Sequence, residues 1–204
     1  MFNFFKNHKL IVFIPLAFAL YSLAFQDAKI FWYMYTFALL VLMSFSVIFT
    51  KVFDEMPTWK SLIYGLGYGT AIYAIIAGGF QFFKLLSFNI EGSVSSFIST
   101  FAPSSIWHYL LLMFIIVPGE EIFWRGFVQQ KLKSYVPTRG SVLIAALLFG
   151  LALGFGGFVP GVFAGIATGI VLGFLYEWKR SMPLLIIAHL VMIVLLFLVL
   201  PLPA

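Results

Sequence analysis

Long apolar stretches alternate with short polar connections along most of the chain. A transmembrane helix needs about 20 mostly apolar residues, and seven stretches approach this length. They span residues 9–25, 30–50, 61–83, 105–128, 141–155, 158–178 and 183–202. The fifth is short, which is typical of a helix that is tilted or partly buried within protein. The pattern predicts an all-α fold, a polytopic integral membrane helical bundle of about seven transmembrane helices.

The composition supports this prediction. Hydrophobic residues make up 63% of the chain and charged residues 9%, and the mean hydropathy is +1.08, whereas soluble domains carry roughly 25% charged residues. Once the apolar stretches are placed, residues 1–204 hold no separate soluble domain, so we expect a single integral membrane domain. The chain has no cysteine, which excludes disulfides and a thiol nucleophile. No cleavage pattern follows the first apolar stretch, so we expect it to be retained.

The basic residues fall mostly on one side of the predicted membrane. With the N-terminus inside, only Lys29 and Lys84 lie in external connections. The internal segments hold Lys6, Lys9, Lys51, Lys60, Lys131, Lys133, Arg139, Lys179 and Arg180. The positive-inside rule therefore predicts an integral protein of the plasma (inner) membrane with a cytoplasmic N-terminus and an external C-terminus. Orientation explains the net charge of +5, so we expect the lipid bilayer, and no nucleic acid, as a partner.

Two further patterns concern the connections and the helix faces. The longest external connection, residues 85–104, reads as a loop, with or without an interfacial segment. Gly161, Gly165, Gly169 and Gly173 recur every four residues in the sixth stretch, which keeps them near one helix face. Small residues let helices approach closely, so we expect this face to pack inside the bundle; a dimer face and a substrate groove are the alternatives.

A cluster of charges interrupts the fourth apolar stretch, formed by Glu120, Glu121 and Arg125. A charge at the centre of a bilayer costs about 2.5–3.5 kcal/mol, so intramembrane charges are first interpreted as functional. Four-residue spacing places Glu121 and Arg125 on one helix face, where they can pair. Glu120 points elsewhere, so we expect it to stay free and suited to general acid–base chemistry. The alternative is a charged helix end at the interface, with the helix stopped by Pro118 and Gly119.

Of the three histidines, one lies inside an apolar stretch. His8 lies in the polar N-terminal segment, where we expect it to be solvated, and His108 opens the fourth stretch beside two aromatic residues, which favours an interfacial position. His189 is the strongly polar residue of the seventh stretch and must face protein or a wet cavity. We interpret it as a partner for Glu120; a purely structural histidine is the alternative.

The residues Glu120-Glu121-Ile122-Phe123-Trp124-Arg125-Gly126-Phe127 resemble the first motif of the CPBP family of intramembrane proteases. This family includes the Rce1-type CAAX prenyl endopeptidases and the bacterial Abi/bacteriocin-immunity proteins. The resemblance covers about residues 105–200. In the aligned second motif, Leu153 stands where the family has histidine. In the third, His189 matches, and Ile193 stands where the family has asparagine or aspartate.

The resemblance implies a role for each candidate residue. Glu120 would be the base that activates water, Glu121 and Arg125 its supporting pair, and His189 a donor to the oxyanion. The substrate or partner would be a peptide or a segment of a membrane protein. Catalytic zinc usually has three protein ligands, whereas the motif region offers only its carboxylates and His189. A divalent metal such as zinc is therefore left open as a cofactor.

Three functions are consistent with these residues. The first is a CAAX-type intramembrane endopeptidase whose cavity opens toward the cytoplasmic side. The second is a catalytically impaired member of the family, a pseudoenzyme that binds a membrane partner as an immunity or scaffold protein; Leu153 and Ile193 support it. The third is a small ion or proton-coupled transporter, against which the lack of a detectable repeat argues.

Overall fold

The computed structural model describes residues 9–86 and 90–202 of the chain, and this part is a helical bundle. The prediction for His8 lies outside the described residues. Six helical segments are long and apolar enough to cross a membrane, and the shorter apolar helix α2 accompanies them. The segments are α2 (Lys9–Phe25), α3 (Phe31–Phe49), α4 (Thr58–Leu85), the motif helix (Ile106–Leu132), α9 (Thr138–Leu153, prolonged to Gly156 by η3), α10 (Val159–Lys179) and α11 (Met182–Val194), which η4 (Leu195–Val199) prolongs. The predicted fold class is confirmed.

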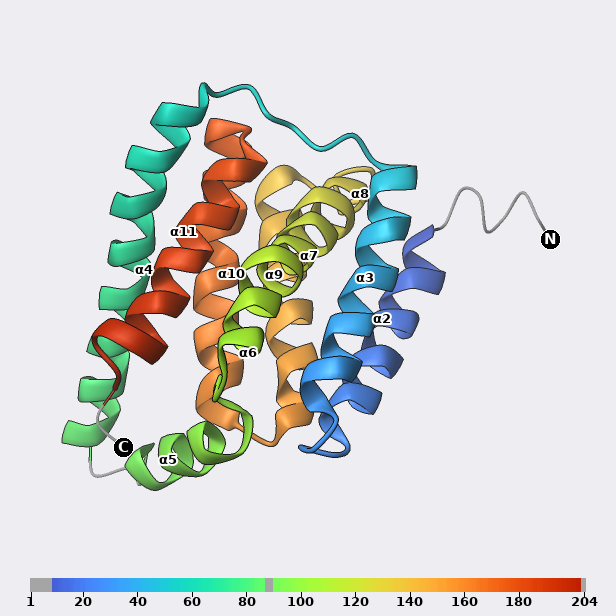
Figure 1. The fold of residues 1–204 in the computed structure, drawn as a ribbon. Coiled ribbons are helices and arrows are strands. Elements are labelled where there is room, and N and C mark those ends of the chain that lie inside the picture. Colours follow the sequence, from blue (N-terminus) through green and yellow to red (C-terminus); the bar gives the residue numbers. More distant parts are fainter. Residues whose placement is uncertain (1–8, 87–89, 203–204) are drawn as a thin grey trace.

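The helices alternate in direction, so the bundle has two distinct ends (Figure 1). One end, here called the basic end, contains the connection between α3 and α4 and the turn between α10 and α11. Its described basic residues are Lys9, Lys51, Lys60, Lys131, Lys133, Arg139, Lys179 and Arg180. The opposite end, here called the α5 end, contains Lys29 and Lys84. The charge asymmetry expected from the sequence is therefore also an asymmetry of the folded bundle.

The motif helix continues through Pro118 and Gly119, so the alternative in which these residues stop it is wrong. It consists of α6 (Ile106–Leu111), η1 (Leu112–Ile116), α7 (Val117–Glu121), η2 (Ile122–Gln129) and α8 (Gln130–Leu132), with wider π-turns in η1 and η2. A proline removes one backbone donor, and π-turns re-route the hydrogen bonds around it. The charged motif therefore lies near the middle of a membrane span.

The connection after α4 is largely helical. Helix α5 (Ile90–Phe101) lies across the α5 end of the bundle (Figure 1). It buries Ile90 and Val94, and its Phe97 ring stacks on Phe158 at a centroid distance of 4.5 Å. A plain loop is thus excluded for this stretch, and the expected additional segment is a helix.

The glycines of α10 bring that helix close to α9. A Cβ added to Gly165 would lie 3.3 Å from Cα of Gly150, and one added to Gly169 would lie 2.9 Å from Cα of Ala146. Ordinary side chains at these positions would push the two backbones apart. The expected packing role inside the bundle is confirmed for these two glycines.

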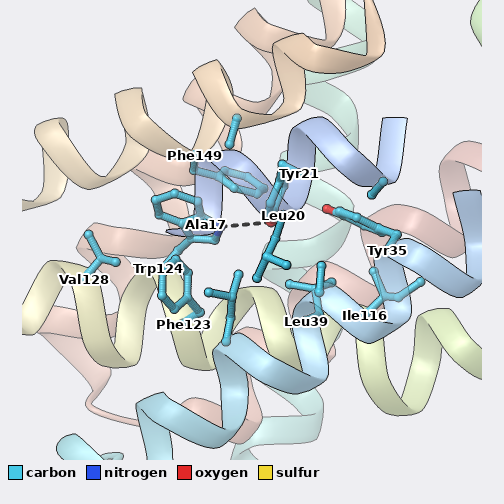
Figure 2. Packing of buried hydrophobic residues seen from close by; sticks show 14 of the residues in the cluster. Ala17, Leu20, Tyr21, Tyr35, Leu39, Ile116, Phe123, Trp124, Val128 and Phe149 are labelled. Carbon is cyan, nitrogen blue, oxygen red and sulfur yellow. Dashed lines mark hydrogen bonds between the residues drawn. The ribbon is translucent and has the colours of Figure 1, made fainter. Parts of the chain in front are cut away.

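The largest buried cluster joins α2, α3, η2 and α9, on the α2 and α3 side of the motif (Figure 2). Trp124 is fully buried and donates a hydrogen bond from Nε1 to the hydroxyl of Tyr21 at 3.1 Å. The Tyr21 ring in turn meets the Tyr35 ring edge-on at 5.2 Å. This packing fixes the motif helix against the N-terminal helices and brings Tyr35 of α3 next to the motif.

Candidate active site

The four residues singled out in the sequence lie together in the centre of the bundle. Glu120 and Glu121 end α7, Arg125 lies one turn later in η2, and His189 lies in the second half of α11. Their exposed fractions are 6% for Glu120, 0% for Glu121, 2% for Arg125 and 4% for His189. Groups of this polarity are rarely buried unless they are paired. Their mutual contacts therefore decide how the site works.

Glu121 is the hub of these contacts. Arg125 donates a hydrogen bond from Nη1 to Oε1 of Glu121 at 2.9 Å, as their spacing predicted. The Nδ1 atom of His189 lies 2.7 Å from the same oxygen. His189 also meets Glu120, the partner expected from the sequence, although its hydrogen bond is to Glu121. The reason is geometric: the imidazole uses Nδ1 for Glu121 and turns Nε2 toward Oε2 of Glu120, 3.8 Å away.

Glu120 has a partner that the sequence did not indicate. The hydroxyl of Tyr35, from α3, donates a hydrogen bond to Oε1 of Glu120. Tyr35 is buried, and its ring stacks on Phe31 at 5.2 Å. The expectation that Glu120 is free is therefore wrong for Oε1. A tyrosine within an apolar stretch was the available signal, but it does not say which helix the hydroxyl faces.

Arg125 is held on its remaining sides by packing. Its guanidinium lies over the Phe149 ring at 4.6 Å, a cation–π contact that strengthens when water is excluded. Gly169 makes room for it, since an added Cβ would lie 3.3 Å from Nη2. Among the described side chains, Nη2 of Arg125 and Oε2 of Glu121 are buried without a hydrogen-bond partner. Unsatisfied buried groups of this kind are uncommon in folded proteins.

A cavity of about 210 Å³ borders the site. Glu120 and His189 form part of its wall, with Tyr35 and Thr168 as further polar side chains, and the rest of the lining is mostly apolar. Leu153 and Ile193 also line this cavity. The two positions that the motif resemblance aligns with a histidine and with an asparagine or aspartate thus border the same space as Glu120 and His189.

The cavity extends from the motif toward the α5 end. Its lining includes Phe25 at the end of α2, Phe31 at the start of α3, and Phe97 and Phe101 of α5. The expectation of a cavity open toward the end that carries the basic residues is therefore wrong. The motif lies near the middle of its helix rather than near the basic end, and the side chains that follow it fill that half of the bundle.

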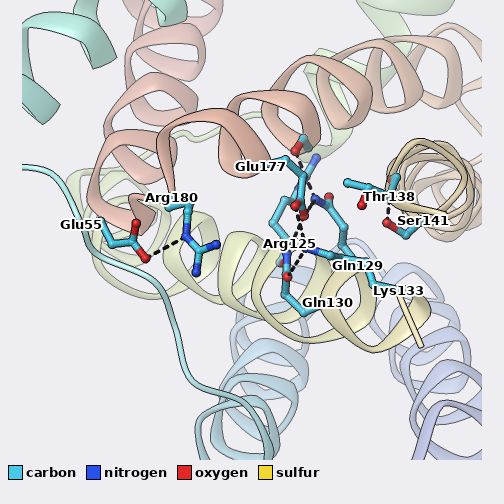
Figure 3. Close-up of polar contacts among 10 residues, drawn as sticks. Glu55, Arg125, Gln129, Gln130, Lys133, Thr138, Ser141, Glu177 and Arg180 are labelled. Atoms are coloured by element: carbon cyan, nitrogen blue, oxygen red, sulfur yellow. Dashed lines mark hydrogen bonds and ion pairs between the residues drawn. The ribbon is translucent and has the colours of Figure 1, made fainter. Parts of the chain in front are cut away.

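A polar clamp ties η2 and α8 to α10 on the basic side of Arg125 (Figure 3). Gln129 donates from Nε2 to the carbonyl of Gly173 at 3.1 Å and to Oε1 of Glu177 at 2.8 Å. Gln130 donates to the same oxygen at 2.8 Å, and Lys133 donates to Oε2 of Glu177 at 2.7 Å. These bonds hold the end of the motif helix and thereby the register of Arg125.

The donor set does not fit a metal ion. Within residues 9–86 and 90–202, no group of three or more His, Cys, Asp or Glu side chains has the arrangement needed to hold one. Glu121 already shares Oε1 between Arg125 and His189, and the guanidinium places a positive charge beside it.

His108 does not join the site. Its ring stacks on Trp32 at 4.3 Å with the planes 3° apart, and its Nδ1 accepts a hydrogen bond from the backbone of Ser104 at 3.2 Å. These contacts place it in the first turn of the motif helix, at the α5 end. The interfacial position expected from the sequence stays a prediction.

The fold and the site together define a polytopic helical membrane protein with a buried carboxylate, guanidinium and imidazole cluster facing an internal cavity. Residues 102–195 match the family described as type II CAAX prenyl endopeptidase Rce1-like. This match confirms, for residues 102–195, the resemblance to the CPBP family of intramembrane proteases that the motif indicated. Comparison with curated proteins and with solved structures gave no significant match.

Proposed function

We propose that the protein is an intramembrane endopeptidase of the CPBP type, in which Glu120 activates a water molecule to attack a peptide bond. The observation that carries this proposal is the placement of Glu120. Its Oε1 accepts the Tyr35 hydrogen bond, while its Oε2 faces Nε2 of His189 at 3.8 Å on the wall of the cavity. This separation is too long for a direct hydrogen bond, and an oxygen atom beside both groups can bridge them.

The reaction follows from these positions. Oε2 of Glu120 takes a proton from water, and the water oxygen attacks the carbonyl carbon of the substrate. Nε2–H of His189 donates to the oxyanion that forms, which is the kind of preorganised donor that stabilises tetrahedral intermediates. Glu120 then returns its proton to the leaving nitrogen as the C–N bond breaks. A positioned general base typically contributes a factor of about 10²–10⁴.

Charge balance supports this division of roles. Glu120, Glu121 and Arg125 together carry one negative charge when both carboxyl groups are ionised. One proton shared between Glu120 and His189 makes the whole cluster neutral, which suits a low-dielectric site. With that proton on His189, Nε2 is a donor and Glu120 is a base, as the proposed reaction requires.

Glu121 and Arg125 act as the supporting pair in this proposal. Glu121 accepts Nδ1–H of His189, which fixes the imidazole so that Nε2 points into the cavity. Arg125 holds Glu121 in turn. A histidine oriented by a carboxylate is a recurrent arrangement in acid–base catalysis.

The cavity favours an apolar peptide or membrane-protein segment as substrate. Apart from Glu120, His189, Tyr35 and Thr168, its wall is mostly apolar, so a charged side chain would find little to pair with. We place the protein in the plasma membrane with its N-terminus in the cytoplasm, which the concentration of basic residues at one end of the bundle supports.

One observation favours a second candidate function. Leu153 and Ile193 line the cavity where the family signature has a histidine and an asparagine or aspartate, so two polar groups of the signature are replaced by aliphatic ones. A loss of this kind reduces catalysis and leaves the cavity able to bind. The chain would then act as an immunity or scaffold protein that holds a peptide of a membrane partner.

The two functions are separated by one assay on purified protein in lipid nanodiscs. Prenylated and unprenylated CAAX reporter peptides, and peptides with an apolar segment, are incubated with wild type and with Glu120→Gln. Cleavage that depends on Glu120 supports the endopeptidase. Retention of a peptide without cleavage, weakened by Thr168→Trp in the cavity wall, supports the binding protein. Ion flux in liposomes abolished by Glu120→Gln would instead support the transporter.

A further inference from the structure

We propose that the substrate reaches Glu120 from the α5 end of the bundle, beneath helix α5, and not from the basic end. The substrate is then an apolar peptide segment presented on the outer face of the membrane. That the ligand is a substrate rests on the function proposed above. Access from the α5 end rests on the lining of the cavity, and the assignment of that end to the outside rests on the distribution of the basic residues.

The lining of the cavity gives the direction. Of α2 it includes only Phe25, in the last turn, and of α3 only residues from the first turns, such as Trp32. Of α11 and η4 it includes residues from His189 onward, ending at Phe197. Each of these helices thus borders the cavity only with the part nearest the α5 end. The space leads away from the basic end.

The basic side of the motif is closed. Phe123, Trp124, Phe127 and Val128 follow Glu121 along η2, and each has an exposed fraction of 0%. The clamp centred on Glu177 then joins the end of the motif helix to α10 (Figure 3). A peptide coming from this end would have to displace both the aromatic packing and the clamp.

The connection between α3 and α4 adds a second closure at the basic end. Asp54 pairs with Ser181 as an isolated antiparallel bridge, and Glu55 forms an ion pair with Arg180 at 2.7 Å. Met182 donates its backbone N–H to the carbonyl of Phe53 at 2.9 Å. This segment is therefore fixed across the turn between α10 and α11 (Figures 1 and 3).

Helix α5 covers this end of the cavity with apolar side chains. Ile90 and Val94 are buried in a cluster with Phe80, Phe97 stacks on Phe158, and Phe101 meets Phe31 at 4.9 Å. Its described ion pair, between Glu91 and Lys84, is half exposed, and such surface pairs contribute little to stability. Because Phe97 and Phe101 of α5 line the cavity, α5 is the element that a peptide entering from this end must displace.

The charge distribution identifies the side on which α5 lies. Eight of the described basic residues lie at the opposite end, against Lys29 and Lys84 at this one. The positive-inside rule places the basic end in the cytoplasm and α5 outside. An exported peptide, or the outer part of a membrane protein, is therefore the class of substrate that this site admits.

The chain has no cysteine, so single cysteines report access directly. Thr168→Cys places a near-isosteric thiol in the cavity wall. Ser95→Cys on α5 and Ser134→Cys at the basic end are exposed reporters for the two faces. Each variant is treated with a charged, membrane-impermeant methanethiosulfonate, first in intact cells and then in inverted membrane vesicles.

We expect Ser95→Cys and Thr168→Cys to react in intact cells, and Ser134→Cys to react only in inverted vesicles. Adding Phe97→Ala should speed the reaction of Thr168→Cys severalfold, whereas Phe82→Ala, at an exposed position on α4, should not. Reaction of Thr168→Cys from the same side as Ser134→Cys would overturn the proposal. So would protection of Thr168→Cys from both sides while the two reporters react.

This experiment involves no hydrolysis. Access from the α5 end therefore stands or falls independently of the endopeptidase. A protein that binds without cleaving still gives the expected labelling, and an active protease reached from the basic end fails this test alone.

Discussion

The hydroxyl of Tyr35 donates a hydrogen bond to Oε1 of Glu120, which joins α3 to the motif helix at the site itself. Tyr35 lies outside the segment that matches the family, residues 102–195. The N-terminal helices are therefore part of the candidate active site and not merely its support. With Oε1 occupied by this bond, Oε2 is the carboxylate oxygen left to face the cavity and His189.

Tyr35→Phe should lower kcat by about 10–100-fold and leave KM nearly unchanged, because a hydrogen bond to a charged group contributes about 1.5–3 kcal/mol and here orients the base. Tyr176→Phe is the matched control, since this tyrosine is also buried but its hydroxyl accepts a hydrogen bond from the backbone N–H of Phe53, away from Glu120. The measurement is steady-state cleavage of whichever reporter peptide the wild type accepts. Equal losses in the two variants would contradict a positioning role for Tyr35.

A second measurement on the same variants does not depend on cleavage. Dicyclohexylcarbodiimide is an apolar reagent for buried carboxyl groups, and mass spectrometry counts its adduct on Glu120. Tyr35→Phe should label faster than wild type, because Oε1 loses the hydroxyl that covers it, while Tyr176→Phe should label as wild type does. Unchanged labelling in Tyr35→Phe would show that the hydroxyl does not cover Glu120.

Arg125→Met should destabilise the protein by about 3–5 kcal/mol, because it leaves the buried Glu121 carboxylate without its guanidinium. Adding Glu121→Gln removes the second charge, so the double variant should regain much of the lost stability. It should not regain activity, since His189 loses the carboxylate that orients it. Thermal unfolding in detergent, followed by intrinsic fluorescence, measures the stability. A single variant as stable as wild type would contradict the buried pair.

Gly169→Ala should destabilise the bundle by about 1–3 kcal/mol, as overpacking typically does. Its Cβ would lie 2.9 Å from Cα of Ala146 and 3.3 Å from Nη2 of Arg125, so activity should fall as Arg125 shifts. Gly78→Ala is the control, because nothing lies within 4 Å of its added Cβ. There the gain in helix propensity is up to about 1 kcal/mol. In thermal unfolding, Gly169→Ala should have a lower unfolding temperature than wild type and Gly78→Ala. A higher unfolding temperature for Gly169→Ala than for Gly78→Ala would refute close packing at Gly169.

Leu153→His combined with Ile193→Asn should raise cleavage, because both side chains enter the cavity that Glu120 and His189 line. One added oxyanion donor typically contributes a factor of about 10²–10³. The triple variant with Glu120→Gln is the control and should be inactive. If the double variant folds and binds peptide but cleaves no faster than wild type, these two positions do not limit catalysis.

The sequence predicts the helices well and the site only in part. A membrane segment must satisfy its backbone hydrogen bonds internally, so long apolar stretches such as 30–50 and 158–178 become helices of nearly those lengths. The pairing of Glu121 with Arg125 was likewise predictable, because it depends only on spacing along one helix.

Features that depend on how the helices are rotated and packed were not predictable from one sequence. Nothing in the pattern around Tyr35 says that its hydroxyl meets Glu120, and nothing around His189 says that Nδ1 bonds Glu121. The extent of the cavity depends on Trp124 and Phe127 filling the basic side, which is a property of packing. Pro118 suggested a helix end, because a π-turn that accommodates it has no sequence signal of its own.

The proposed role of Glu120 is tested most directly by the cleavage rate of Glu120→Gln against wild type in nanodiscs. Glu91→Gln is the control, at an exposed carboxylate of α5. We expect Glu120→Gln to lose a factor of about 10²–10⁴ in kcat while its unfolding temperature stays that of wild type. Glu91→Gln should keep the wild-type kcat. Cleavage by Glu120→Gln at the wild-type rate would show that Glu120 does not activate the water.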